Sequence, residues 1–178
     1  LSVTAADVNV IYASVGDNPD NTMTTDGLYK STDEGVTWSA MRIGANSIIG
    51  GQGWYGHALG VSSTDVNEVV WGELDTYRSS NGGTSFTKSG FWNRWNVNNT
   101  TVGTIQEGTD DNYVHADVHR IICSPHDASG NTFFLCTDGG VFRTTDGGLN
   151  FQTLNGGLNT AQIYSNMAIS PVNSNYML

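Results

Sequence analysis

Two histidines and an aspartate occupy alternate positions in YVHADVHR at 113–120, as His115, Asp117 and His119. Imidazole and carboxylate groups can hold a polar ligand, transfer protons or bind a divalent metal. On a β-strand all three would point to one face, but the outer two would lie about 13 Å apart, too far for one ion to bind all three. We therefore predict no cofactor. A divalent metal on two adjacent members is one alternative, and a plain polar lining is another.

Aromatic side chains gather in two segments rich in Gly or Asn. GGQGWYGH at 50–57 contains Trp54 and Tyr55, and SGFWNRWNVNN at 89–99 contains Trp92 and Trp95. Exposed rings on loops can stack on the faces of sugars, whereas rings buried between structural units would serve packing alone. These four aromatics are candidate ligand-binding residues, with burial as the alternative.

The two cysteines, Cys123 and Cys136, flank the turn-like stretch SPHDASGN. In an antiparallel hairpin they could lie nearly opposite each other and form a disulfide. The spacing does not fix the distance between their Cα atoms, so two small buried apolar side chains are the alternative.

The composition indicates the elements that position these residues. Only 13% of the 178 residues are charged, while Gly (22 residues), Asn, Ser and Thr are abundant, which is typical of short strands joined by tight turns. A net charge of −10 disfavours nucleic acid and anionic membrane surfaces as partners. No apolar run is long enough to span a membrane, and the first ten residues lack the features of a signal peptide. We predict an all-β chain without membrane insertion.

One eight-residue pattern occurs three times, as STDEGVTW at 31–38, SSNGGTSF at 79–86 and TTDGGLNF at 144–151. We call it the box motif. Each copy has a hydroxyl residue, an Asp or Asn, a glycine and an aromatic at matching positions: Ser31, Asp33, Gly35, Trp38; Ser79, Asn81, Gly83, Phe86; Thr144, Asp146, Gly148, Phe151. Asp and Asn accept hydrogen bonds from nearby backbone N–H groups, and glycine allows a positive φ. The motif predicts a structural turn with the aromatic tucked beneath it.

The segments around each box motif repeat in the same order: two apolar strands, a short strand ending in a basic residue, the box, and a further strand. Each repeat therefore predicts a four-stranded antiparallel unit, the size of a propeller blade. The approximate blades are residues 1–48, 49–114 and 115–160, with the start of a fourth at 161–178. Three blades cannot close a ring, so we expect a fragment of a larger propeller.

The box motif resembles the Asp-box, or BNR repeat, of sialidases, sortilin-type receptors and xyloglucanase-like propellers. From about residue 50, the order of segments is similar to secreted Bacteroidetes propellers described as glycosyl-hydrolase-like or sortilin-like and exported by the type IX system. The resemblance implies a ring of about seven or more blades. It also implies a secreted or cell-surface location.

The same resemblance draws attention to Asp138 in CTDGGVFRTTD, because an aspartate in this setting is implicated in catalysis in xyloglucanase-type glycosidases. Glycoside hydrolysis needs two carboxyl groups about 5 to 9.5 Å apart, and the available partners are Asp117, Glu73 and Asp75. The alternative, which we favour, is that Asp138 caps a turn with the two glycines. Sialidase activity needs an arginine cluster to bind the sugar carboxylate. This chain has five arginines, and two of them, Arg78 and Arg143, occupy a repeated structural position. We therefore predict no sialidase activity.

The sequence thus predicts part of an all-β propeller that binds carbohydrate or a protein partner. One alternative is a glycoside hydrolase that uses Asp138 or Asp117 with a second carboxylate from missing blades. A structural component of a surface assembly is the other.

Overall fold

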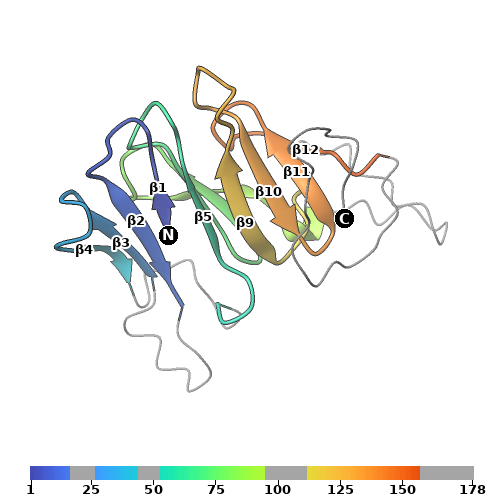
Figure 1. The fold of residues 1–178 in the computed structure, drawn as a ribbon. Helices are drawn as coiled ribbons and strands as arrows, with labels where there is room; N and C mark the ends of the chain where they lie inside the picture. The colour runs from blue at the N-terminus through green and yellow to red at the C-terminus, as the bar shows by residue number, and fades with distance from the viewer. Residues whose placement is uncertain (17–26, 44–52, 95–111, 157–178) are drawn as a thin grey trace, which may run out of the picture.

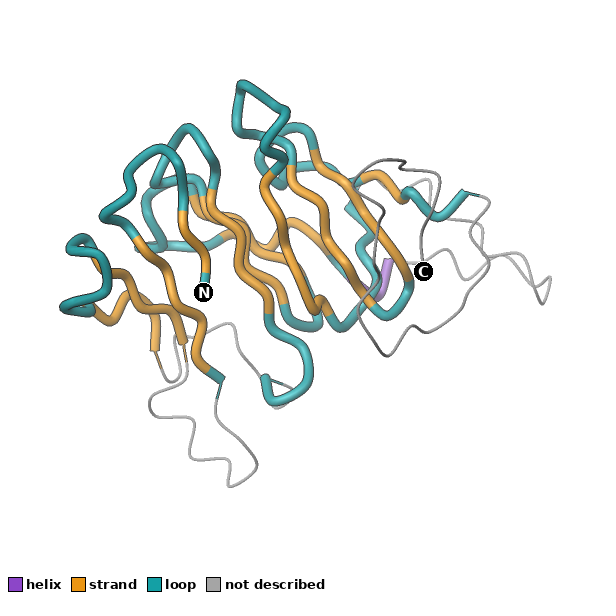
Figure 2. Tube along the Cα trace, viewed as in Figure 1, coloured by secondary structure: helices purple, strands orange, loops and turns teal. Residues whose placement is uncertain are grey.

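A computed structural model describes residues 1–16, 27–43, 53–94 and 112–156. These residues form three four-stranded antiparallel sheets, so the predicted all-β fold is confirmed (Figures 1 and 2). We call the sheets blades 1, 2 and 3. The predicted boundaries of the repeats stay predictions, and the fourth unit at 161–178 lies outside the described residues.

Each blade follows the chain order from one edge to the other. Blade 1 contains β1 (Ser2–Val3), β2 (Ile11–Val15), β3 (Gly27–Ser31) and β4 (Ser39–Ile43). Blade 2 contains β5 (Ala58–Val61), β6 (Val69–Gly72), β7 (Thr76–Ser79) and β8 (Thr87–Gly90), and a short 3-10 helix, η2 (Trp92–Arg94), follows it. Blade 3 contains β9 (Val118–Cys123), β10 (Phe133–Thr137), β11 (Gly140–Thr144) and β12 (Gln152–Thr153).

The blades pack face to face, and β5 of blade 2 lies between β1 of blade 1 and β9 of blade 3 (Figure 1). Strand β6 has the sequence VVWG and is buried along its whole length. Val69 and Trp71 pack toward blade 1, whereas Val70 packs toward blade 3. A continuous apolar run is the pattern of a strand buried on both faces, which is the position of a middle blade.

The three box motifs form turns that are built alike. In each, the opening hydroxyl accepts a hydrogen bond from the N–H of the motif glycine: Ser31 from Gly35 at 2.9 Å, Ser79 from Gly83 at 3.0 Å, and Thr144 from Gly148 at 2.9 Å. The same hydroxyl donates to the Asp or Asn two residues on. Each box joins the third strand of its blade to the fourth.

The box aromatics differ in burial. Phe151 is buried between blades 2 and 3, and Phe86 packs partly buried between blades 1 and 2. Trp38 is less buried than these two: its ring is 41% exposed, and its Nε1 donates a hydrogen bond to the carbonyl of Gly35 in the same turn. Phe86 and Phe151 pack at an interface with the preceding blade, and no described blade precedes blade 1.

Among the described residues, no helix is both long and apolar enough to cross a membrane.

Candidate functional site

The prediction that His115, Asp117 and His119 share one face of a strand was wrong. Strand β9 begins at Val118, and Asp117 has a φ of 63°, so the chain turns just before the strand. Only His119 lies in the strand. The three side chains therefore have separate environments, and no group of three or more His, Cys, Asp or Glu residues is placed to hold a metal ion within the described ranges.

His115 lies beneath the turn between β10 and β11. Its Nδ1 is 3.0 Å from the carbonyl oxygen of Ala116, and its ring packs so closely against Gly139 that an added Cβ there would lie 2.2 Å from Cδ2 of His115. His115 therefore supports the turn that carries Asp138.

The side chain of Asp117 lies in a different environment from those of His115 and His119. Its Oδ1 atom is buried and has no hydrogen-bond partner within the described ranges. The adjacent N–H of Val118 donates to the carbonyl of Glu73 at 2.8 Å, which joins the start of β9 to blade 2. This bond to blade 2 fixes where the strand begins, next to the positive φ of Asp117.

Asp138 is the centre of a cluster drawn from three distant segments. One carboxylate oxygen lies 2.6 Å from Nε2 of His119, and the hydroxyl of Tyr55 donates to the other at 3.1 Å. The Tyr55 ring meets the His119 ring edge-on, with centroids 5.0 Å apart, and the Trp54 ring lies 5.6 Å from that of Tyr55. We call Trp54, Tyr55, His119 and Asp138 the acid–aromatic cluster.

The turn that carries Asp138 is held by its neighbours. Thr137 Oγ1 accepts a hydrogen bond from the N–H of Gly139 and donates to the carbonyl of Gly140, both at 3.1 Å. Asn155 donates to the carbonyl of Gly139 at 2.7 Å and accepts from the N–H of Val141 at 2.8 Å. The favoured prediction that Asp138 caps this turn was therefore wrong, because Thr137 and Asn155 make the capping bonds and the Asp138 carboxylate bonds His119 and Tyr55.

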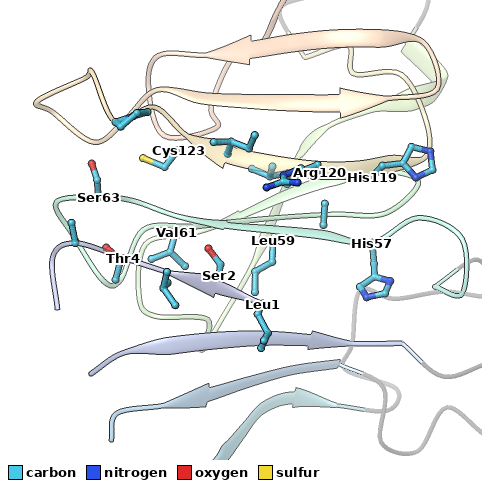
Figure 3. A pocket seen from close by; sticks show the side chains of 16 residues that line it. Leu1, Ser2, Thr4, His57, Leu59, Val61, Ser63, His119, Arg120 and Cys123 are labelled. Atoms are coloured by element: carbon cyan, nitrogen blue, oxygen red, sulfur yellow. The ribbon is translucent and has the colours of Figure 1, made fainter. Parts of the chain in front are cut away.

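Of the cluster, His119 lines one end of a groove of about 560 Å³ between the first strands of the three blades (Figure 3). His57, on the segment before β5, lies near the same end as His119, and its Nδ1 is 2.6 Å from the carbonyl oxygen of Gly53. Arg120 and Leu59 line the middle of the groove, and Cys123 lines the far end. The groove follows the inner edge of the sheets, which in a propeller faces the central channel.

The aromatic candidates are exposed where the structure describes them. Trp54 is 63% exposed, Tyr55 41% and Trp92 43%, so burial between blades does not apply to these three. Trp92 begins η2, where its backbone N–H donates to Asp75. Trp95 lies outside the described residues.

Two of the proposed carboxylate partners of Asp138 have environments of their own in blade 2. Glu73 is buried, and Asp75 accepts hydrogen bonds from Lys88 at 2.5 Å and from Trp92.

The cysteines do not face each other. Cys123 is opposite Phe133, and Cys136 is opposite Arg120. This register places them three positions apart along the strands, about 10 Å, which exceeds the reach of a disulfide. Both thiols are free, so the possible disulfide is not formed, and burial raises the pKa of Cys136.

The sequence analysis named all four residues of the cluster but did not predict the contacts that join them. Tyr55 and Asp138 are 83 positions apart, and no local pattern links them. His57 was missed as a groove residue. Its place two residues after Tyr55 in the glycine-rich segment is the signal that could have found it.

Comparison with known proteins shows the fold alone. No family model matches the chain, and no curated protein matches it. Among solved structures, the GH74 enzyme of Niastella koreensis is similar over 85% of this chain, with 24% identity and a TM-score of 0.52. The GH74 xyloglucanase of Xanthomonas campestris is similar over 87% of this chain, with 13% identity and a TM-score of 0.53. This chain spans 17% and 23% of their respective lengths, and both are β-propellers.

Proposed function

We propose that the chain is part of a larger secreted or cell-surface propeller and that its acid–aromatic cluster binds carbohydrate. The observation that carries this proposal is the Asp138 carboxylate held between His119 and Tyr55, beside the exposed ring of Trp54. A sugar presents hydroxyl groups, which donate to a carboxylate, and an apolar face, which packs on an aromatic ring. The cluster offers both surfaces, and its His119 lines the end of a groove, where ligand sites commonly lie.

The proposed export through the type IX system and the kinship with sortilin-like propellers of Bacteroidetes rest on the order of sequence segments around the three box motifs. Fractionation of the source cells tests the location. Recovery of the protein only from the cytoplasm would contradict it.

Binding to a panel of polysaccharides, measured by calorimetry, tests the carbohydrate proposal. We expect Trp54→Ala and Asp138→Asn each to weaken binding at least about tenfold, the effect of losing one good contact of about 1.4 kcal/mol. Trp92→Ala is the control, since Trp92 is also an exposed tryptophan but stands on η2. Equal loss from Trp92→Ala would place the ligand elsewhere, and no affinity for any glycan, together with a stable protein partner, would favour a structural component.

Glycoside hydrolysis is a second candidate, favoured by the exposed carboxylate of Asp138 within the TDGG segment. In this candidate Asp138 works with a second carboxylate from further blades, about 5 to 9.5 Å away. Release of reducing ends by the full-length protein, abolished by Asp138→Asn with binding retained, would establish it. Binding without any cleavage would exclude it.

A further inference from the structure

One contact between neighbouring blades occurs at a repeated position. Arg78 on β7 of blade 2 donates from Nε to the carbonyl of Gly147, in the box motif of blade 3, at 3.1 Å. Lys30 occupies the same place on β3 of blade 1, and its Nζ lies 3.3 Å from where a Cβ on Gly82, in the box motif of blade 2, would be. In both cases the basic residue of one blade reaches the first glycine of the box in the next blade.

The residue paired with each basic side chain is covered by the second box glycine. Tyr12 lies opposite Lys30 and Val70 lies opposite Arg78, and these two side chains are 0% and 1% exposed. A Cβ on Gly148 would lie 3.2 Å from Val70. The glycine pairs in the boxes of blades 2 and 3 thus lie directly on the preceding blade.

Blade 3 has residues at the equivalent positions, but no described box motif packs on them. Phe134 lies opposite Arg143 and also opposite Ile122 of β9. Phe134 is partly exposed and Ile122 is 42% exposed. In Arg78, the Nε atom donates to the carbonyl of Gly147 in the next box. The corresponding Nε atom of Arg143 is buried and has no hydrogen-bond partner among the described residues. A buried N–H without a partner is costly, and an acceptor at this position would remove that cost.

The sequence of β10 also indicates a strand that is covered on both faces. Strand β10 begins FFLC, a continuous apolar run like VVWG of β6. Strand β6 is buried on both faces, whereas in β10 Phe133 and Leu135 are buried and the alternate residues Phe134 and Cys136 are only partly so. Such a run is typical of a strand with both faces covered.

We propose that Ile122, Phe134 and Arg143 form the docking face for the box hairpin of a further blade. The carbonyl of its first box glycine accepts the hydrogen bond from Nε of Arg143, and its second glycine packs on Phe134. The 178 residues contain three box motifs, and blades 1 to 3 already use all of them, so the hairpin belongs to polypeptide outside this sequence. This inference rests on the proposed larger ring and is independent of glycan binding.

Hydroxyl-radical footprinting, read by mass spectrometry, tests the docking face. The oxidation rate of Phe134 is compared between the 178-residue chain and the full-length source protein, with Tyr12 as the buried reference and Leu149 as the exposed one. We expect Phe134 to be oxidised several-fold more slowly in the full-length protein, at any protein concentration. An unchanged rate would overturn the proposal. Protection of the 178-residue chain that grows with concentration would identify a second copy as the occupant and would also overturn it.

The Arg143 contact is tested in the full-length protein with Arg143→Met, which keeps an apolar stem but removes the Nε donor. We expect oxidation of Phe134 to rise several-fold in this variant. Arg78→Met is the matched control, because it removes the observed contact between blades 2 and 3 and should leave the rate at Phe134 unchanged. Slow oxidation of Phe134 in Arg143→Met would overturn the hydrogen bond. If Arg143→Met does not fold, the wild-type comparison still decides whether the face is covered.

Discussion

Gly139 shows how a residue without a side chain controls the acid–aromatic cluster. It follows Asp138 directly, and the ring of His115 fills the space beside its Cα, so that an added Cβ would lie 2.2 Å from that ring. The imidazole of His115 therefore packs directly against the turn between β10 and β11. The position of the Asp138 carboxylate therefore depends on the fit between Gly139 and His115.

We expect Gly139→Ala to destabilise the chain by about 1 to 3 kcal/mol, the usual cost of overpacking, and to weaken any ligand binding at Asp138. Gly156→Ala is the control, because nothing lies within 4 Å of an added Cβ at Gly156. Urea unfolding and calorimetry of both variants check this. A Gly139→Ala protein as stable as Gly156→Ala would contradict the predicted clash.

At the scale of elements, the box turns share their hydrogen bonds but differ in one titratable group. Hydrogen bonds from the hydroxyl and N–H of Thr37 hold the pKa of Asp33 below its ordinary value. For Asp146, partial burial raises the pKa, but hydrogen bonds from Asn150, Thr144 and Leu149 together outweigh it and the net shift is downward. Asn81 fills the same position in blade 2, where its Oδ1 accepts from the N–H of Ser85 at 2.9 Å.

The sign of the pH effect follows from these lowered pKa values. A carboxyl group whose pKa is lowered by folding contributes stability above its unfolded pKa, about 3.9, and that contribution is lost as the pH falls through the folded pKa. We expect the chain to lose stability below about pH 4, and Asp33→Asn with Asp146→Asn to flatten this loss. The amide keeps the hydrogen-bond geometry, as Asn81 shows. Urea unfolding from neutral to acid pH measures the slope, and an equally steep loss in the double variant would refute the assignment.

Local patterns predicted the box turns and the strands around them because the deciding contacts lie within a few residues. The Ser79 hydroxyl donates to Asn81 and accepts from the N–H of Gly83, so the spacing of these residues contains the geometry. The strand predicted through His115 to His119 failed because Asp117 adopts a positive φ that its sequence context does not require. The bond between Val118 and Glu73 of blade 2 helps to fix the start of β9, and no single segment contains that information.

At the scale of the molecule, packing between blades decides which face of a strand is buried and which residues meet at the groove. The repeat predicted four-stranded units, but not that Tyr55 of one unit would bond Asp138 of the next. Nor could the pattern show that Arg78 bonds the box of blade 3, although its recurrence as Lys30 and Arg143 indicated a structural position. Long-range pairings of this kind depend on how the twisted sheets stack, which periodicity does not specify.

At Gly60 on β5, blades 2 and 3 lie close together. An added Cβ there would lie 2.5 Å from Cγ2 of Ile121 and 3.2 Å from Cδ1 of Phe133, both in blade 3. We expect Gly60→Ala to cost about 1 to 3 kcal/mol through overpacking, and Ile121→Ala to cost about 2 to 5 kcal/mol through a cavity.

The two changes should compensate in part, because the new methyl group of Gly60→Ala enters the space that Ile121→Ala vacates. In a double-mutant cycle followed by urea unfolding, the double variant should therefore be more stable than the sum of the single losses predicts, by at least about 0.5 kcal/mol. Gly60→Ala combined with Gly156→Ala is the control pair and should be additive, since nothing lies near an added Cβ at Gly156. Additive losses in Gly60→Ala with Ile121→Ala would mean that the blades do not approach each other at this point in solution. The stacking on which both the groove and the docking face depend would then need to be revised.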